Sequence, residues 1–343
     1  MIAQRLEPST DAPGPTGLSG STRDRFTALV QWAVRAPSSH NTQPWLFRVR
    51  GKVLELCLDR SRTLECVDPD RRAMVMSCGA ALYYARLALR NDGYRPEVEL
   101  LPDGRDPILL ARLRIGTASP PTREERQLFA AIPQRRTNRH PFEEREVPIL
   151  LLRALDRAAG SEGAWLDIVT DSDDKRAIAE LIATGDRVQG SSRDMRRELA
   201  RWISSNGDAR RDGIPGYALG FGPLSSRFAP FVVRTFDWGK LRAESDFELA
   251  LHSAALLVIR TEADTPAAWL RAGAGLARLL LLAAANGISA SFLNQPIEVP
   301  SLRRELARVL CVSGTPQLLL RIGYGEHVRE TPRRAVDEVL QSD

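Results

Sequence analysis

The chain contains 343 residues, with 48 Lys and Arg against 43 Asp and Glu, which gives a formal net charge of +5. This length buries a sizeable core, and the mild charge, with arginines spread along the chain, argues against a nucleic-acid-binding protein. The four cysteines lack zinc-ligand spacing, so we expect no metal site and a reducing, cytoplasmic compartment. The first residues also lack the basic and then apolar pattern of a signal sequence.

Residues 1–20 are rich in Pro, Gly, Ser and Thr, which predicts a flexible tail. Apolar residues at helical spacing then predict a helix over 22–35, which Pro37 ends because the residue before a proline avoids helical angles. The runs "WLFRV" and "VLELCL" flank Gly51 and predict a β-hairpin.

The most apolar stretch is "WLRAGAGLARLLLLAAANG", residues 269–287. It contains Arg271 and Arg278, and its uninterrupted apolar run is too short to span a bilayer. We therefore expect a buried core helix and no membrane partner.

Two parts of the chain repeat one pattern. Residues 79–94 and 273–288 align without a gap, and each is followed by a segment ending "LRIG", at 113–116 and 320–323. A fainter third match lies upstream of both. Three matches in the same order predict an internal duplication of an α+β unit.

The predicted units span 21–130 and 131–343. The offset between equivalent landmarks increases from 122 to 194 residues, so the second unit carries about 72 additional residues, at about 170–260. This insertion is rich in glycines and aromatics. It predicts either a lid-like binding segment or a solvated excursion, and both interpretations remain open.

The segment "APSSHNTQPW", residues 36–45, places short hydrogen-bonding groups before a large aromatic. Such groups reach a ligand without steric cost, although a helix end and turn would use them equally well. Trp45 is expected to pack in the core, His40 either to face solvent, which we favour, or to contact a ligand, while Gln43 is left undecided. The candidate ligand-facing residues are Pro37, Ser38, Ser39 and Asn41.

The segment "RRTNRHPF", residues 135–142, combines guanidinium groups with hydroxyl and amide donors, a set that suits a phosphate. A solvated basic loop is the alternative. The candidate residues are Arg135, Arg136, Thr137 and Arg139.

These two segments, together with "GISASFLNQP" (287–296) and "TPRR" (331–334), resemble the nitroreductase-like flavoproteins, and the match is closest to their duplicated, single-chain Acg family. The resemblance implies an α+β nitroreductase-like fold, internally duplicated so that one monomeric chain forms a pseudo-dimer. It implies one FMN per chain, at the interface between the units, because only one copy of each motif is complete.

In that arrangement the first unit supplies the Pro37–Asn41 loop, and the second supplies the Arg motif, a main-chain N–H facing flavin N5 and C-terminal basic residues. The N–H would come from Leu293, Asn294 or Gln295, and the basic residues are Arg333 and Arg334. We expect that replacing Arg136 and Arg139 together by Ala weakens flavin binding by several kcal/mol, at about 1.5–3 kcal/mol for each charged hydrogen bond.

The implied function is an FMN-dependent oxidoreductase that takes hydride from NAD(P)H and passes it through flavin N5 to a small organic acceptor. No catalytic side chain is required. Two alternatives remain: a non-catalytic flavin carrier whose insertion covers the ring, and a specialised dehydrogenase acting on one metabolite. "GAGLAR" does not support a nicotinamide-binding Rossmann site, and the acids of "ESDFELALH" predict a solvated helix face.

Overall fold

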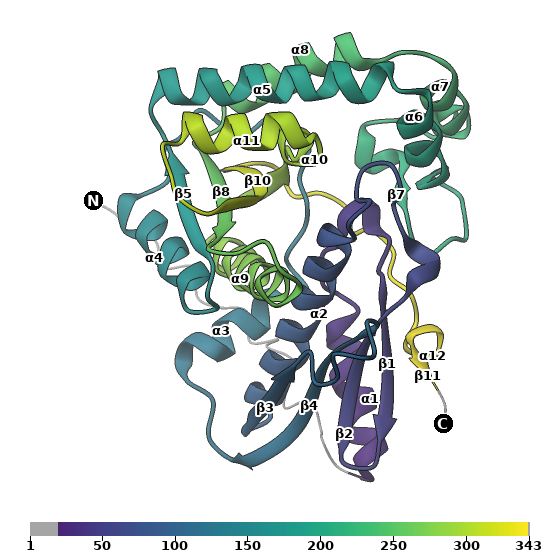
Figure 1. Cartoon of the computed structure of the whole chain (residues 1–343), viewed down its shortest axis with the longest axis vertical. Helices are drawn as coiled ribbons and strands as arrows, with labels where there is room; N and C mark the ends of the chain where they lie inside the picture. The colour runs from purple at the N-terminus through teal and green to yellow at the C-terminus, as the bar shows by residue number, and fades with distance from the viewer. Residues whose placement is uncertain (1–19, 342–343) are drawn as a thin grey trace.

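The two larger β-sheets lie in opposite halves of the molecule, and two long helices, α2 and α9, lie between them (Figure 1). The computed structural model describes residues 20–341, so the predicted tail over residues 1–20 lies, apart from Gly20, outside the described residues. The α-helices are α1 (Thr22–Ala33), α2 (Arg72–Asn91), α3 (Arg123–Ala131), α4 (Ile149–Gly160), α5 (Ser172–Ser191), α6 (Arg193–Arg201), α7 (Ala229–Thr235), α8 (Gly239–Leu251), α9 (Pro266–Ala285), α10 (Gln295–Glu298), α11 (Pro300–Val309) and α12 (Val336–Val339).

The strands lie between these helices along the chain and form mainly antiparallel sheets, as in the predicted α+β class. They are β1 (Trp45–Arg50), β2 (Val53–Leu58), β3 (Tyr94–Leu100), β4 (Leu109–Ala118), β5 (Trp165–Val169), β6 (Ile203–Ser204), β7 (Ile214–Pro215), β8 (Ala255–Thr261), β9 (Ser289–Phe292), β10 (Thr315–Gly323) and β11 (Leu340–Gln341).

The first sheet has the order β11-β1-β2-β4-β3. Its β1–β2 hairpin turns at Gly51, whose φ of 58° is the left-handed conformation that glycine adopts without strain. The predicted hairpin is therefore confirmed. The C-terminal strand β11 returns to pair in parallel with β1, so the end of the chain is attached to the first half of the molecule.

The second sheet has the order β5-β8-β10-β9, and its neighbouring strands are antiparallel. Strand β10 is buried along most of its length because both faces are covered: α4 and α9 pack on one face, and α5 and α11 pack on the other. Apart from the added β11, this sheet repeats the strand order and directions of the first: β5, β8, β10 and β9 correspond to β1, β2, β4 and β3.

The helices α2 and α9 cross at glycines. A methyl group at Gly79 would overlap the carbonyl oxygen of Leu270, and a methyl group at Gly273 would overlap that of Met76. Each glycine thus faces the residue three positions before the other glycine, and the two helices make the same contact in both directions. Of the described helices, α9 alone is long and apolar enough to cross a membrane, but it is mostly buried, which confirms the prediction of a core helix.

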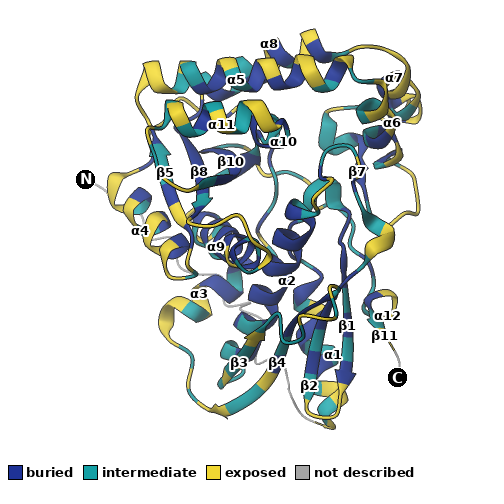
Figure 2. Ribbon diagram, in the orientation of Figure 1, coloured by how far each residue is buried: buried dark blue, intermediate teal, exposed yellow. Residues whose placement is uncertain are grey.

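The segment from α5 to α8 joins β5 to β8, where the first sheet has only the short hairpin at Gly51. Helices α5 and α8 pack together on the outer side of the second sheet, and α6 and α7 lie to one side of them (Figure 1). Burial is concentrated in α2, α9 and the strands next to them (Figure 2).

The far part of this segment reaches the first half of the molecule. Arg62 donates from Nη1 to Asp212 at 2.7 Å, and Glu198 accepts the N–H groups of Cys66 and Val67 at 2.9 and 3.1 Å. These contacts rule out a solvated excursion for this part of the segment.

Candidate ligand cavity

A cavity of about 730 Å³ lies where the two halves and the α5–α8 segment meet. This volume is in the range of small-molecule sites. Eleven of the thirteen residues predicted to face a ligand line it: Pro37, Ser38, Ser39, Asn41, Arg135, Arg136, Thr137, Arg139, Asn294, Gln295 and Arg333. The other two, Leu293 and Arg334, do not.

The loop from the first half is held in a strained conformation. His40, Asn41 and Gln43 have φ angles of 48°, 54° and 51°, values that side-chain-bearing residues rarely adopt. Ser38 accepts the N–H of Gln43 at 2.9 Å, and the Asn41 amide donates to the carbonyls of Gly213 (2.9 Å) and Pro332 (3.1 Å). The loop is therefore shaped by contacts to both the insertion and the C-terminal segment.

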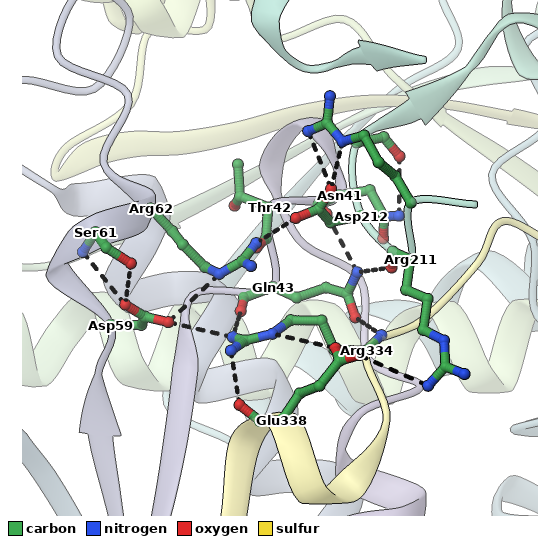
Figure 3. A network of polar contacts seen from close by, with 12 residues as sticks. Asn41, Thr42, Gln43, Asp59, Ser61, Arg62, Arg211, Asp212, Arg334 and Glu338 are labelled. Atoms are coloured by element: carbon green, nitrogen blue, oxygen red, sulfur yellow. Dashed lines mark hydrogen bonds and ion pairs between the residues drawn. The ribbon is translucent and has the colours of Figure 1, made fainter. Parts of the chain in front are cut away.

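The sequence left the role of Gln43 undecided. In the structure its side chain connects its own loop to two other segments by hydrogen bonds (Figure 3). It is fully buried; its Nε2 donates to the Arg211 carbonyl at 2.8 Å, and its Oε1 accepts the N–H of Arg334 at 2.7 Å. The Arg334 guanidinium turns away from the cavity to Asp59 (3.2 Å) and to the carbonyl of Glu338 (2.8 Å). Arg334 thus attaches the C-terminal segment to β1 and β2, and we exclude it from the ligand set.

Three arginines converge at one end of the cavity, which we call the basic end: Arg135, Arg136 and Arg333. Arg135 is buried, and its Nε and Nη1 have no acceptor among the described residues; the same holds for Arg333 Nε. Burial, and then the nearby Arg135, lower the pKa of Arg333 to about 9. Arg136 pairs with Glu330 at 3.3 Å. The basic end therefore has more donors than this exposed carboxylate satisfies.

The Arg motif is fixed to the second sheet through Asn138. Its N–H donates to the Ala290 carbonyl at 3.0 Å, next to a bridge between Thr137 and Ala290, and its side-chain amide donates to the Glu326 carbonyl at 2.9 Å. Arg135 and Arg136 lie on one side of this anchor, and Arg139 lies on the other.

Arg139 lines another part of the cavity, near Arg242 and Asp246. Burial, and then Arg242, lower its pKa to about 10, and Asp246 opposes that change. His40 also lines the cavity, and burial, with Arg139, lowers its pKa to about 4, so the imidazole is neutral at physiological pH. Of the two possibilities that the sequence left open for His40, solvent or ligand, its place in the cavity lining favours the ligand.

A polar cluster that the sequence did not predict lies in this part of the cavity, which we call the acidic end. The Nε2 of Gln295 donates to Asp186 Oδ1 at 3.0 Å and to Asp246 Oδ2 at 2.8 Å. Both aspartates are 1% exposed. Burial, and then the charge of Asp246, raise the pKa of Asp186 to about 7, while Arg242 pairs with Asp246 at 3.0 Å.

The expected solvated face of "ESDFELALH" is wrong for Asp246, because α5 packs over that side of α8. The signal that could have revealed the cluster is Gly185, next to Asp186. A methyl group at Gly185 would lie 2.7 Å from the Cβ of Gln295, so the glycine lets α10 approach α5.

The segment predicted to present an N–H group begins α10. Leu293 is buried, and its N–H already donates to the Leu319 carbonyl at 2.9 Å, so it does not reach the cavity. Asn294 and Gln295 precede the first intrahelical hydrogen bonds of α10, in which Ile297 and Glu298 donate to the Asn294 carbonyl. The main-chain N–H groups of Asn294 and Gln295 therefore remain the candidates for the predicted hydrogen bond to the ligand.

The α5–α8 segment supplies an apolar wall, formed by Leu199, Ile203, Ile214, Leu219, Phe221, Val232, Val233, Trp238 and Leu241. Tyr217 lies beside this wall, and its hydroxyl donates to the Glu330 carbonyl at 2.6 Å. Phe228 is not part of the lining. Within residues 20–341, no group of three or more His, Cys, Asp or Glu side chains lies close enough to hold a metal ion.

The fold and the cavity define an α+β protein with a ligand-sized cavity lined by both halves of the chain. No family model matches the chain. It is 33% identical over 340 residues to the Mycobacterium tuberculosis protein named "Putative NAD(P)H nitroreductase Rv3131", covering 97% of this chain and 96% of that one. It is 31% identical over 331 residues to "Putative NAD(P)H nitroreductase acg" of the same organism, covering 93% and 96%.

The chain therefore belongs to the nitroreductase superfamily, among these Acg-like proteins, as its motifs indicate. One solved structure similar to it is the FMN-dependent nitroreductase NfnB from Mycobacterium smegmatis in complex with NADPH. It is 19% identical, with a TM-score of 0.41, and the similarity covers 63% of this chain and 98% of that one.

Proposed function

We propose that the chain is an FMN-dependent oxidoreductase that takes hydride from NAD(P)H and passes it to a small organic acceptor. The observation that carries the proposal is the composition of the cavity. It brings together the Pro37–Asn41 loop, the Arg135–Arg139 motif and Arg333, segments separated by up to about 300 residues in sequence. The names of the Acg-like relatives support the nicotinamide donor.

FMN fits the side chains present. Its phosphate needs several hydrogen-bond donors, and the unpaired N–H groups of Arg135 and Arg333 are buried at the basic end. Its flat ring needs apolar surface, which the α5–α8 wall provides. An N–H of Asn294 or Gln295 would orient the ring. Bound FMN would supply the hydride chemistry, and the protein supplies binding, orientation and electrostatics.

We further propose that one gene duplication produced the two units, 21–130 and 131–343, and that the chain works as a monomer with one FMN. The shared strand order and the reciprocal glycine contact of α2 and α9 support the duplication. The monomer is supported by the cavity itself, because both halves that line it belong to one chain. A cytoplasmic location is part of the same proposal.

The α5–α8 segment acts as a lid in this proposal. Leu241 and Val232 line the cavity and are also exposed, which supports a route for an acceptor from the surface. The hydrogen bond from Tyr217 to Glu330 instead supports the second candidate, a flavin carrier, because it joins the lid to the C-terminal segment across the cavity rim.

The test is an anaerobic visible spectrum of the purified protein before and after adding NADPH and, separately, NADH. Rapid bleaching of a yellow protein is the expected result, and the faster donor identifies the coenzyme. A yellow protein that stays oxidised with both donors, but is reduced by light and EDTA, would support the carrier. A colourless protein that fails to take up added FMN would overturn both.

A further inference from the structure

The exposed apolar side chains of the molecule are concentrated in one short segment. Ten large apolar residues are exposed among those described, and six of them lie between 224 and 241, with 41% to 76% of each residue accessible. They are Leu224, Phe228, Phe231, Val232, Phe236 and Leu241. We call this set the apolar lip.

Helix α7 presents one side of the lip. Ala229 and Val233 face inward to a small core with Ala200 and Ile203, whereas Phe228, Phe231 and Val232 point outward. The helix is therefore apolar on its inner side and also on part of its outer side. Single exposed apolar residues are normal, but a cluster of this kind marks a surface that binds a protein, a membrane or a ligand.

Basic side chains outnumber acidic ones in the segments that carry the lip or pack against α7. Counting the exposed charged residues of α6, which packs against α7, and of the segment 224–241 gives six basic against two acidic groups. The basic residues are Arg193, Arg197, Arg201, Arg227, Arg234 and Lys240, and the acidic ones are Asp194 and Asp237. The Arg234 guanidinium lies over the Phe231 ring, at 5.9 Å from its centroid.

We propose that the apolar lip docks the protein on an anionic lipid surface. Aromatic residues flanked by Lys and Arg are the composition of segments that lie at a membrane interface, where the rings enter the acyl boundary and the cations meet lipid phosphates. This peripheral contact replaces the expectation of no membrane partner, which rested on the lack of a spanning segment. Figure 1 shows α6 and α7 together at one corner of the molecule.

A second copy of the chain fits this surface less well. A symmetric dimer through the lip would place the same patch on both partners, so basic groups would face basic groups. An anionic surface neutralises them instead.

The lip also continues into the cavity, because Val232 and Leu241 belong to both. Docking therefore gives the cavity access to acceptors dissolved in lipid, such as long-chain quinones. This consequence rests on the proposed function, whereas docking itself does not.

The experiment is co-sedimentation of the full chain with vesicles of phosphatidylglycerol and phosphatidylcholine, or of phosphatidylcholine alone. We expect binding to the anionic vesicles that weakens as salt rises. The triple variant Phe228→Ser, Phe231→Ser, Phe236→Ser should weaken it at least about tenfold, since burial of one Phe side chain alone corresponds to that factor. These three residues lie outside the cavity lining.

The matched control is Ile149→Ser with Leu150→Ser, because both residues are exposed apolar groups on α4, outside the lip. The control should bind like the wild type. An equal loss of vesicle binding in the triple variant and the control would overturn the proposal, and so would equal binding of the wild type to anionic and neutral vesicles. A wild-type dimer in light scattering that the triple substitution dissociates would also overturn it.

A second arm compares turnover of a long-chain quinone in the vesicles with that of a short-chain, water-soluble quinone. In the triple variant, turnover of the long-chain quinone should fall at least about tenfold, the factor that corresponds to the lost burial of one Phe side chain. Turnover of the short-chain quinone should stay unchanged. Equal loss of both would overturn the link between docking and acceptor supply. If neither quinone is reduced by the wild type, the proposed function fails while the vesicle result still decides the docking.

Discussion

The α2–α9 crossing and the cavity use the two halves of the chain differently. At the crossing, both halves contribute the same element, a glycine that faces a carbonyl three residues before the other glycine. At the cavity, one half contributes the strained loop and the other contributes the arginines, the α10 terminus and Arg333. Close packing constrains both sides of an interface equally, whereas a single ligand needs each of its binding groups only once.

The largest predicted effect concerns the crossing. Gly79→Ala and Gly273→Ala should each lower the free energy of unfolding by at least about 4 kcal/mol, at the top of the range for single substitutions. The added methyl group meets backbone atoms of the facing helix, which cannot move aside without separating the helices. The measurement is urea denaturation followed by circular dichroism.

Gly160→Ala provides the control, because α4 ends at this residue and a methyl group there meets nothing within 4 Å. It should be neutral or slightly stabilising. A loss of stability in only one of the two variants, Gly79→Ala or Gly273→Ala, would contradict the reciprocal contact.

The acidic end is predicted to make stability depend on pH. The pKa of Asp186 is raised from 3.8 to about 7, so the folded state holds its proton more tightly than the unfolded state. The resulting stabilisation is fully present below pH 4 and is lost as pH rises through 7, up to about 4 kcal/mol in total at 1.36 kcal/mol per pKa unit.

Asp186→Asn should remove this dependence, so the variant should gain stability over the wild type as pH rises from 5 to 8. Denaturation at several pH values measures the difference. Asp194→Asn, at an exposed position on α6, is the control. If the free energies of unfolding of Asp186→Asn and the wild type differ by the same amount at every pH from 5 to 8, Asp186 does not titrate in this range.

The two ends of the cavity are predicted to hold different parts of the flavin. Arg135→Ala and Arg333→Ala should each weaken FMN binding by about 1.5–3 kcal/mol, roughly 10- to 150-fold, because each removes a charged hydrogen bond to the phosphate. Riboflavin, which lacks the phosphate, should be affected little. Fluorescence titration of the flavin-free protein with both ligands measures this.

Arg139→Ala should instead weaken FMN and riboflavin alike, because Arg139 lies at the acidic end. Arg105→Ala, at a fully solvated side chain, should change neither affinity. Losses specific to FMN in the Arg139 variant would contradict the division of the cavity into two ends. The double change of Arg136 and Arg139 combines both ends and does not separate them.

Local sequence patterns predicted the structural features that depend only on residues close together in the chain. The hairpin at Gly51 and the core helix α9 follow from alternation, apolar spacing and turn chemistry, and the motif segments were found as short runs. Asp186 and Asp246 were missed because each looks like an ordinary surface acid on its own helix. Only the packing of α5 on α8 buries them, and it joins residues 60 positions apart.

The neighbouring residues Arg333 and Arg334 show the same limit of prediction from local sequence. Arg333 enters the cavity and donates to Asn41 Oδ1 at 3.0 Å, whereas Arg334 turns to Asp59 and Glu338. The sequence predicted both as ligand-facing, but in an extended segment successive side chains point to opposite sides, and only Arg333 lines the cavity. Which one does so depends on the position of Gln43, far away in sequence.

The smallest predicted effect concerns Glu330, the carboxylate that pairs with Arg136 at 3.3 Å and Arg35 at 3.5 Å. Because its side chain is 46% exposed, Glu330→Gln should change stability by less than about 1 kcal/mol. It should tighten FMN binding a few-fold, since the phosphate no longer competes with a carboxylate for Arg136, and leave riboflavin binding unchanged. The same fluorescence titrations measure both ligands. Weaker FMN binding in this variant would show that Glu330 orients Arg136 toward the ligand and does not compete with it.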